Sequence, residues 1–436
     1  MNKGKISLII LVSVILVFTA TAFAQIIEKR PSIAGKEYVP GEIIVKFKPL
    51  VNEETVTKIN QRHRASVVYK SPVLGFRRLK IPEEKTIPEM IESYRKDPNV
   101  EYAEPNYIAY AFWTPNDEYF KYQWHLDNPK YGGINMQKAW DVTGGPGNPG
   151  AGVIVAVVDT GVAYENYDIY ALAPDLAGTS FVSGYDFVNN DDHPNDDEGH
   201  GTHVTGTIAQ TTDNSIGVAG VAFSCSIMPI KVLDSTGSGT YADVAEGIRW
   251  AADNYAQVIN LSLGGKFSSE TLRLACEYAY KKGVVLVCAA GNDGRAVVSY
   301  PAAYDDYCIA VGATRYDETR AYYSNYGKSL DLVAPGGDLR VDQNKDGYGD
   351  GVLQQTFKSG QPTNFAYYFY QGTSMATAHV SGVAALLIYK GVSGPDNIRN
   401  ILQTTAEDKG LAGWDKYYGW GIVDAYKALL KATGSL

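Results

Sequence analysis

Apolar segments that alternate with helical stretches constrain the fold of residues 114–436 more than any other feature of the sequence. The strand candidates are mostly apolar segments, at Val153–Val158, Ser226–Val232, Val258–Leu261, Val284–Ala289 and Cys308–Val311. The helical stretches between and after them are Gly201–Ala209, Tyr241–Asn254, Ser268–Lys282 and Ser374–Tyr389. Continuous strands interleaved with helices indicate a mostly parallel sheet covered on both faces. We therefore expect a doubly wound α/β domain whose site lies beyond the carboxyl ends of the strands.

Residues 37–110 predict a smaller α+β domain. Its expected strands are Gly41–Phe47, Ala65–Tyr69, Val73–Ile81 and Val100–Tyr107, and its expected helices are Glu53–Gln61 and Ile87–Lys96. The order βαββαβ is typical of a ferredoxin-like domain. Nothing in this segment has catalytic spacing.

The first 24 residues read as a secretory signal. Lys3 and Lys5 precede the apolar run 9–17, and Ala22-Phe23-Ala24 supplies the small residues that a signal peptidase reads. Gln25 would then be the first residue after cleavage. A retained membrane anchor is the alternative, because the apolar stretch approaches the length of a spanning helix. We expect signal removal and a secreted, extracellular protein.

The chain is acidic, and its charge is unevenly distributed. Its formal net charge is −9, whereas residues 114–436 hold 22 basic and 36 acidic residues, or −14. Such a body is a poor partner for nucleic acid or an anionic membrane surface. We therefore expect no nucleic-acid partner, no membrane partner after signal removal, and a monomer. Four cysteines in a chain this long do not form a disulfide scaffold.

Three polar motifs fall at strand ends or helix starts. Asp159 directly follows an apolar run, His200 opens a helical stretch, and Ser374 opens another. Taken singly, each residue has an ordinary structural explanation, such as a turn or a helix cap. Together they supply a nucleophile, a base that takes its proton, and a carboxylate that orients the base.

These motifs, VVDTGV, GHGTHVTGTIA and GTSMATAHVSG, resemble those of the subtilase family of serine endopeptidases. The resemblance covers 114–436 and extends, in 25–113, to the family's inhibitory propeptide. It implies that Ser374 is the nucleophile, His200 the general base and Asp159 the orienting carboxylate, in a chain order known for subtilisin. His203 would be a packing histidine. Polypeptides would be the substrates, and the propeptide would be an intramolecular inhibitor, cleaved off within 107–114.

The resemblance also implies where a substrate is held. Asn292, in the segment Ala289-Ala290-Gly291-Asn292, would donate its side-chain amide to the oxyanion, together with the backbone N–H of Ser374. Two chain edges would bind an extended peptide as an added strand. The residues concerned are Gly237, Ser238 and Gly239 on one edge and Ser262, Leu263 and Gly264 on the other, with Ala289, Gly291 and Ser299 at the first pocket.

Two structural calcium sites follow from the same resemblance. The first would use Asp117, Asp175 and Asn214 with the carbonyls of Thr212, Ile216 and Val218, and the second would use Asp186, Asp191 and Asn195. Oxygen-rich sets of this kind suit a hard cation that takes 6–8 oxygen ligands. A solvated acidic loop is the alternative in each case.

A third calcium candidate is independent of the catalytic motifs and lies within an insertion at about 337–370. Asp342, Asn344, Asp346 and Asp350 match positions 1, 3, 5 and 9 of an EF-hand-type loop. Position 12 is Leu353, so the usual bidentate carboxylate is missing. A plain Gly/Asp turn is the alternative.

Two other functions stay open. A serine esterase of the α/β-hydrolase type would need G-x-S-x-G and the order Ser…Asp…His, but Ala376 replaces the second glycine and the order is reversed. A catalytically inactive binding protein on the same fold would be expected to have lost a member of the constellation. Asp159, His200, Asn292 and Ser374 are all present.

Overall fold

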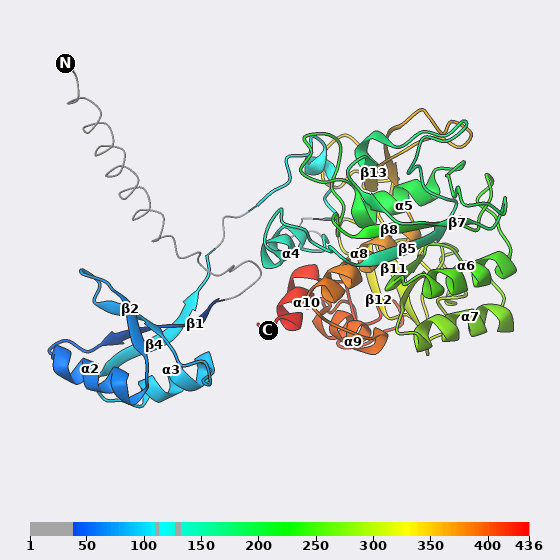
Figure 1. Cartoon of the computed structure of the whole chain (residues 1–436). Helices are drawn as coiled ribbons and strands as arrows, with labels where there is room; N and C mark the ends of the chain where they lie inside the picture. Colours follow the sequence, from blue (N-terminus) through cyan, green and yellow to red (C-terminus); the bar gives the residue numbers. More distant parts are fainter. Residues whose placement is uncertain (1–37, 110–112, 127–131, 436) are drawn as a thin grey trace, which may run out of the picture. The chain divides into compact units, whose positions relative to one another are not determined.

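The structure is a computed structural model that describes residues 38–109, 113–126 and 132–435. The predicted signal peptide and part of the predicted propeptide junction lie outside these residues. The chain divides into two compact units between residues 109 and 110, and Figure 1 shows both. The exact domain boundaries stay a prediction.

The first unit is a four-stranded antiparallel sheet with two helices. Its elements are β1 (Tyr38–Phe47), α2 (Glu53–Arg62), β2 (Ser66–Lys70), β3 (Phe76–Lys80), α3 (Ile87–Arg95) and β4 (Val100–Tyr107). The sheet order is β2-β3-β1-β4, with every neighbouring pair antiparallel. This confirms the predicted ferredoxin-like domain. β3 starts three residues later than expected, because Ser71 and Phe76 close a turn that contains Gly75 at φ 72°.

The second unit contains an eight-stranded parallel sheet of order β12-β11-β10-β9-β5-β8-β6, with β7 pairing to β8. Its strands are β5 (Ile154–Asp159), β6 (Ser180–Phe181), β7 (Tyr185–Asp186), β8 (Ser226–Lys231), β9 (Val258–Leu261), β10 (Val285–Ala289), β11 (Cys308–Thr314) and β12 (Leu332–Pro335). The five predicted strands form the centre of this sheet.

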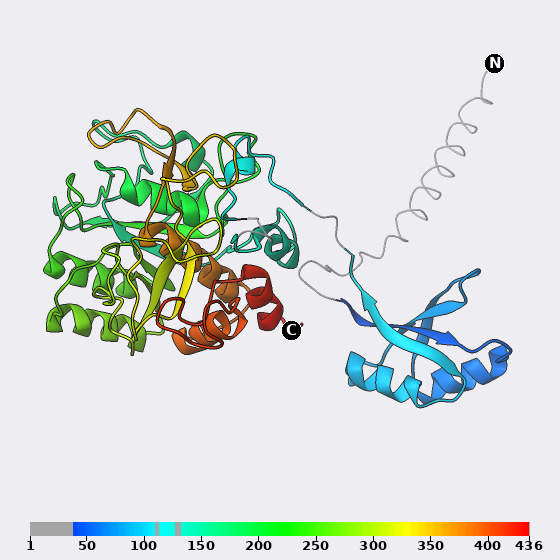
Figure 2. The ribbon, with the colours of Figure 1, turned by 180° about the vertical axis from the view of Figure 1, so that it is seen from behind.

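Helices cover both faces of the sheet, as the doubly wound arrangement requires (Figures 1 and 2). The helices are α4 (Met136–Thr143), α5 (His200–Ala209), α6 (Tyr241–Asp253), α7 (Glu270–Lys281), α8 (Thr373–Tyr389), α9 (Pro395–Thr405) and α10 (Ala425–Ala432), with short 3-10 turns at Phe120–Tyr122 and Pro174–Leu176. Side chains of α5 and α8 share one apolar core with alternate residues of the strands, whereas α6 and α7 share the other. Since α8 is buried along almost its whole length, it forms the centre of the larger core.

The insertion forms a β-hairpin that the sequence did not predict. It consists of β13 (Val352–Thr356) and β14 (Ala366–Tyr370), which pair antiparallel outside the main sheet. β13 packs against α5. The hairpin therefore borders the helix on which His200 lies.

Two further expectations concern cysteines and membrane segments. All four cysteines are buried free thiols in the structure. Among the residues described, no helix is both long and apolar enough to cross a membrane.

Candidate active site

Asp159 and His200 meet where β5 ends and α5 begins. The Nδ1 atom of His200 lies 2.7 Å from Oδ1 of Asp159, and the same oxygen accepts the backbone N–H of Thr160 at 2.8 Å. The next residue, Gly201, explains this close approach, because a Cβ there would lie 2.1 Å from the carbonyl oxygen of Gly161. Only glycine lets α5 start against the end of β5, so the sequence Gly-His-Gly brings the imidazole to the carboxylate.

The environment of His200 favours its protonated form. Burial by itself would lower the pKa of His200, but the Asp159 carboxylate outweighs this through its charge and its hydrogen bond, and Glu198 and Asp196 add further negative charge. The net effect raises the pKa of His200 above its ordinary value. Glu198 also accepts the backbone N–H of His200 at 2.8 Å. Because the protonated form is stabilised, the imidazole is a stronger base.

Ser374 lies in the first turn of α8, facing Ser262 across the sheet edge. Its hydroxyl donates to the carbonyl oxygen of Ser262 at 2.9 Å, and the hydroxyl of Ser262 donates to the carbonyl of Ser374 at 2.9 Å. Ser374 is only 7% exposed. Among the hydrogen bonds of the described residues, none joins Ser374 to His200, and none uses the backbone N–H of Ser374. Free enzymes often tighten such contacts only when substrate is bound.

Asn292 is held with its amide nitrogen free. Its Oδ1 atom accepts both the backbone N–H and the hydroxyl of Thr373, each at 2.9 Å. This leaves Nδ2 to donate elsewhere, beside the start of α8. The sequence identified Asn292 but missed Thr373, whose position next to Ser374 was the available signal.

The predicted substrate residues line two adjoining cavities. One, of about 460 Å³, is lined by Gly237, Ser238, Gly239, Ser262, Leu263 and Gly264 together with His200, Glu198, Thr160, Leu233, Gly265, Tyr241 and Val244. The other, of about 310 Å³, is lined by Ala289, Gly291, Asn292, Ser299, Thr373 and Ser374, by the shared residues 262–265, and by Lys266 and Asp293. The structure therefore brings together every residue predicted for the cleft.

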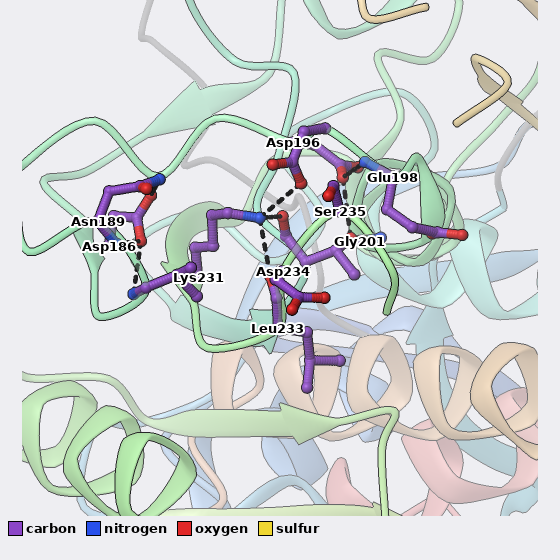
Figure 3. Close-up of polar contacts among 12 residues, drawn as sticks. Asp186, Asn189, Asp196, Glu198, Gly201, Lys231, Leu233, Asp234 and Ser235 are labelled. Carbon is purple, nitrogen blue, oxygen red and sulfur yellow. Dashed lines mark hydrogen bonds and ion pairs between the residues drawn. The ribbon is translucent and has the colours of Figure 1, made fainter. Parts of the chain in front are cut away.

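A buried lysine, which the sequence did not single out, ties the walls of the larger cavity together. Lys231 ends β8 and is fully buried. Its ammonium group donates to the carbonyls of Thr160 and Leu233 and to the carboxylate of Asp197, each at 2.7 Å. Figure 3 shows the Lys231 side chain with three dashed contacts at its ammonium end, and Leu233 and Asp234 lie nearby. A lysine at the end of an apolar strand was the signal for it, since a buried charge needs partners.

Three further histidines are buried away from the cleft surface. His203 stacks on Tyr370, with ring centroids 4.3 Å apart, and its Nε2 lies 3.1 Å from the carbonyl of Val352. This agrees with a packing role. His125 and His379 lie 254 residues apart in the chain, yet their ring nitrogens are 2.7 Å apart. Burial lowers the pKa of His379 to about 4, so this pair stays neutral at ordinary pH.

The residues of the first calcium prediction lie together. Asp117 and Asp175 are buried, and the carboxylate of Asp175 accepts the side-chain amide of Asn214 at 2.8 Å and the N–H of Val218 at 3.1 Å. Oδ2 of Asp117 accepts the N–H of Asp213 at 2.9 Å, whereas its Oδ1 is buried without a partner among the described residues. Burial raises the pKa of both carboxyls, and the charge of Asp117 raises that of Asp175 further.

The residues of the second prediction are close in the chain but engaged with other groups. Asp186 and Asp191 pair through their backbones. The carboxylate of Asp186 accepts two backbone N–H groups and the amide of Asn189. Asn195 donates to Glu165 at 2.9 Å, and its own Oδ1 is buried with no partner in the described part of the chain. In the part of the chain that the structure describes, no three His, Cys, Asp or Glu side chains gather closely enough to hold a metal by themselves.

Ser374, the Asp159–His200 pair and the Asn292 amide lie at the carboxyl edge of a doubly wound parallel sheet. This arrangement is typical of a serine hydrolase. Comparison with known proteins agrees. The model of the subtilase family matches residues 150–421, and that of the fervidolysin N-terminal prodomain matches residues 25–106.

Individual relatives match over most of their length. A thermophilic serine proteinase from Bacillus sp. (strain AK1) is 39% identical over 395 residues, which are 90% of this chain and 88% of the relative. Thermitase from Thermoactinomyces vulgaris is 41% identical over 73% of this chain and 99% of its own. A solved protease structure from Pseudoalteromonas arctica PAMC 21717 covers 73% of this chain and 99% of its own at 36% identity, with a TM-score of 0.64.

The chain therefore belongs to the subtilase family. It is a subtilisin-like serine endopeptidase that carries an N-terminal prodomain. Neither the esterase nor the inactive binding protein gains support from these matches.

Proposed function

We propose that the chain cleaves polypeptides through an acyl-enzyme on Ser374, with His200 as the base and Asp159 as its orienting carboxylate. The observation that carries this assignment is the 2.7 Å contact of Asp159 with Nδ1 of His200. This contact fixes the tautomer and leaves Nε2 as the basic nitrogen.

The reaction would proceed in two halves. The Ser374 oxygen attacks the scissile carbonyl carbon, and its proton passes to Nε2 of His200 while Asp159 stabilises the imidazolium. The resulting oxyanion accepts hydrogen bonds from the Asn292 amide and the Ser374 N–H. When the C–N bond breaks, His200 returns the proton to the leaving amine. A water molecule then attacks the acyl-enzyme carbonyl carbon and gives its proton to His200, which returns it to the Ser374 oxygen as the acid product leaves.

The substrate would be an extended segment of polypeptide. The rims 237–239 and 262–264 both line the larger cavity and are rich in glycine. Such rims suit pairing with a substrate backbone as an added strand, which makes binding tolerant of sequence. The smaller cavity beside Ala289, Gly291 and Ser299 would take the side chain next to the cleaved bond.

The protein would be made as a secreted, monomeric precursor. The first unit folds as a ferredoxin-like domain with its own apolar core. This supports a role for 25–113 as an inhibitor and folding aid that is removed by self-cleavage within 107–114. The motif at residues 1–24 supports export.

A structural calcium ion would bind at Asp117 and Asp175. The residues fit a hard cation, because two carboxylates are buried together and Oδ1 of Asp117 has no partner among the described residues. Asn214 and the carbonyls of Thr212, Ile216 and Val218 would supply further oxygen atoms. A bound ion would offset the like charges and stabilise the fold. Asp186, Asp191 and Asn195 stay a second candidate, since Oδ1 of Asn195 is also unpartnered.

The decisive experiment compares wild type with Ser374→Ala in a host that lacks proteases. Wild-type protein should mature and digest casein, and a covalent serine-directed inhibitor should abolish the digestion. Ser374→Ala should accumulate as the precursor. Maturation of Ser374→Ala at the normal junction would show that another protease cleaves the propeptide.

A further inference from the structure

In the loop 342–350, which precedes β13, the side chains of Asp342 and Asn344 bond to backbone groups of the same loop. Oδ1 of Asp342 accepts the N–H of Asp346 at 3.2 Å, and its Oδ2 accepts the N–H of Gly347 at 3.1 Å. Oδ1 of Asn344 accepts the same Asp346 N–H at 3.0 Å. The oxygens of Asp342 and Asn344 therefore face the interior of one short loop.

The buried carboxylate of Asp350 bonds to the backbone near the start of this loop. Asp350 is 1% exposed, and its Oδ2 accepts the N–H of Gln343 at 2.8 Å. Its Oδ1 is buried and has no partner among the described residues. The charges of Asp342 and Asp346 lie near this carboxylate. An unpaired carboxylate oxygen beside two like charges is costly unless a cation compensates them.

We propose that this loop binds one Ca²⁺ through the side chains of Asp342, Asn344, Asp346 and Asp350. The buried carboxylate of Asp350 would take the part that a position-12 carboxylate plays in an EF-hand. Position 12, Leu353, is buried in β13. The described side chains do not hold three carboxylates within metal-binding distance. Binding would therefore require these carboxylates to move closer together around the ion, with the Asn344 oxygen, backbone carbonyls and water as further ligands, and we expect a Kd on the order of 10⁻⁴–10⁻³ M, as in extracellular calcium modules.

Calcium binding in the loop would affect α5, the helix that carries His200. The loop runs directly into β13, where the Thr356 hydroxyl donates to the carbonyl of Gly199 at 2.5 Å, next to His200. In the same strand Gln355 accepts the N–H of Asp175 at 2.8 Å. Calcium in the loop would thus order the start of a hairpin that supports the base and adjoins the first calcium site.

The test measures calcium binding directly and does not depend on activity. Full-length Ser374→Ala protein, freed of metal, is titrated with Ca²⁺ by calorimetry, alone and with Asp346→Asn or Asp350→Asn. Asp306→Asn, which removes an exposed acid elsewhere in the domain, is the matched control. We expect one weak binding event to disappear in the two loop variants and to persist in the control. Equal stoichiometry and affinity in all four proteins would overturn the proposal.

Hydrogen exchange provides a second readout that tolerates a poorly folded variant. Ca²⁺ should slow exchange of the 342–350 peptide at least several-fold in the parent protein but not in Asp346→Asn. Asp346 is partly exposed, so its replacement is the milder of the two. Unchanged exchange of this peptide in the parent protein at saturating Ca²⁺ would refute binding in the loop. This conclusion would hold whether or not the wild-type protein digests casein.

Discussion

Asn292 is the side chain that we propose stabilises the oxyanion of the transition state. Its oxygen is engaged by Thr373, so only its nitrogen is available to the cleft. Asn292→Asp keeps an acceptor for Thr373 but replaces the donor. We expect kcat to fall at least about 10²–10³-fold with little change in KM, a range established for this donor in subtilisin, a member of the same family, rather than obtained from this geometry.

Steady-state kinetics on a short peptide substrate would check this prediction. Thr373→Val is the matched variant, since it removes one of the two bonds that hold Asn292 and leaves the donor in place. It should lower kcat by a smaller factor. An effect confined to KM in Asn292→Asp would contradict the assignment.

The charges around His200 set the pH range of activity. Only the neutral imidazole can take the proton of Ser374, so kcat/KM should rise with pH through the pKa of His200. Because that pKa is raised, the rise should be centred above pH 6.5, the ordinary value for histidine. Glu198→Gln keeps an acceptor for the His200 N–H but removes a charge that raises the pKa.

We expect the rise in Glu198→Gln to move to lower pH by roughly 0.3–1 unit, the effect of one nearby charge at an intermediate dielectric constant. The measurement is a kcat/KM profile on an uncharged substrate at low ionic strength. A larger shift at high salt than at low salt would contradict an electrostatic cause.

At the scale of elements, the active site depends on how closely α5 approaches β5. A Cβ at Gly201 would meet a backbone oxygen, which cannot move aside as a flexible side chain could. Gly201→Ala should therefore displace the start of α5, lower the free energy of unfolding by roughly 1–3 kcal/mol, and reduce kcat. Gly147→Ala, where the nearest atom to a Cβ would be 3.6 Å away, should do neither.

Thermal unfolding of inhibitor-blocked protein, with kinetics on the free enzyme, would separate the two effects. Full activity in Gly201→Ala would show that the helix can shift without moving His200.

The elements that the sequence predicted are those whose apolar pattern reports burial. β5 and β8–β11 are mostly apolar, and each was predicted to within a few residues. β13 was missed because its sequence, Val-Leu-Gln-Gln-Thr, contains polar side chains that are nevertheless buried. Gln354 and Gln355 are buried because they bond to backbone groups from distant segments, and no local pattern reports such partners.

The same distinction applies to the site. Asp159, His200, Asn292 and Ser374 were found because each belongs to a short motif. Lys231 and the His125–His379 pair were not, since their roles come from contacts between segments far apart in the chain. Sequence patterns therefore identified the candidate reacting groups but not the residues that hold them in place.

At the scale of the whole molecule, the proposed first calcium site would tie together segments that lie, for example at Asp117 and Asp213, 96 residues apart in the chain. Asp117 stands near the start of the protease unit, whereas Asp175 and the 212–218 loop are distant in the chain. Without an ion, two buried carboxylates repel each other. With an ion bound only to the folded state, stability rises by about 2.7 kcal/mol at a 100-fold excess over Kd.

We therefore expect the order of the inactivation temperatures of Asp117→Asn and wild type to depend on calcium. The asparagine can still accept the N–H of Asp213, but it no longer brings a charge into the site. In millimolar Ca²⁺ it should inactivate at a lower temperature than wild type, because a ligand is lost. In EGTA it should be at least as stable as wild type, because the uncompensated buried charge is gone.

Thermal inactivation of inhibitor-blocked mature enzyme measures both conditions without self-digestion. Both proteins should carry Asp346→Asn, so that calcium in the 342–350 loop does not contribute. If Asp117→Asn lowers the inactivation temperature equally in both buffers, the carboxylate stabilises the fold independently of calcium, and no calcium ion is held there.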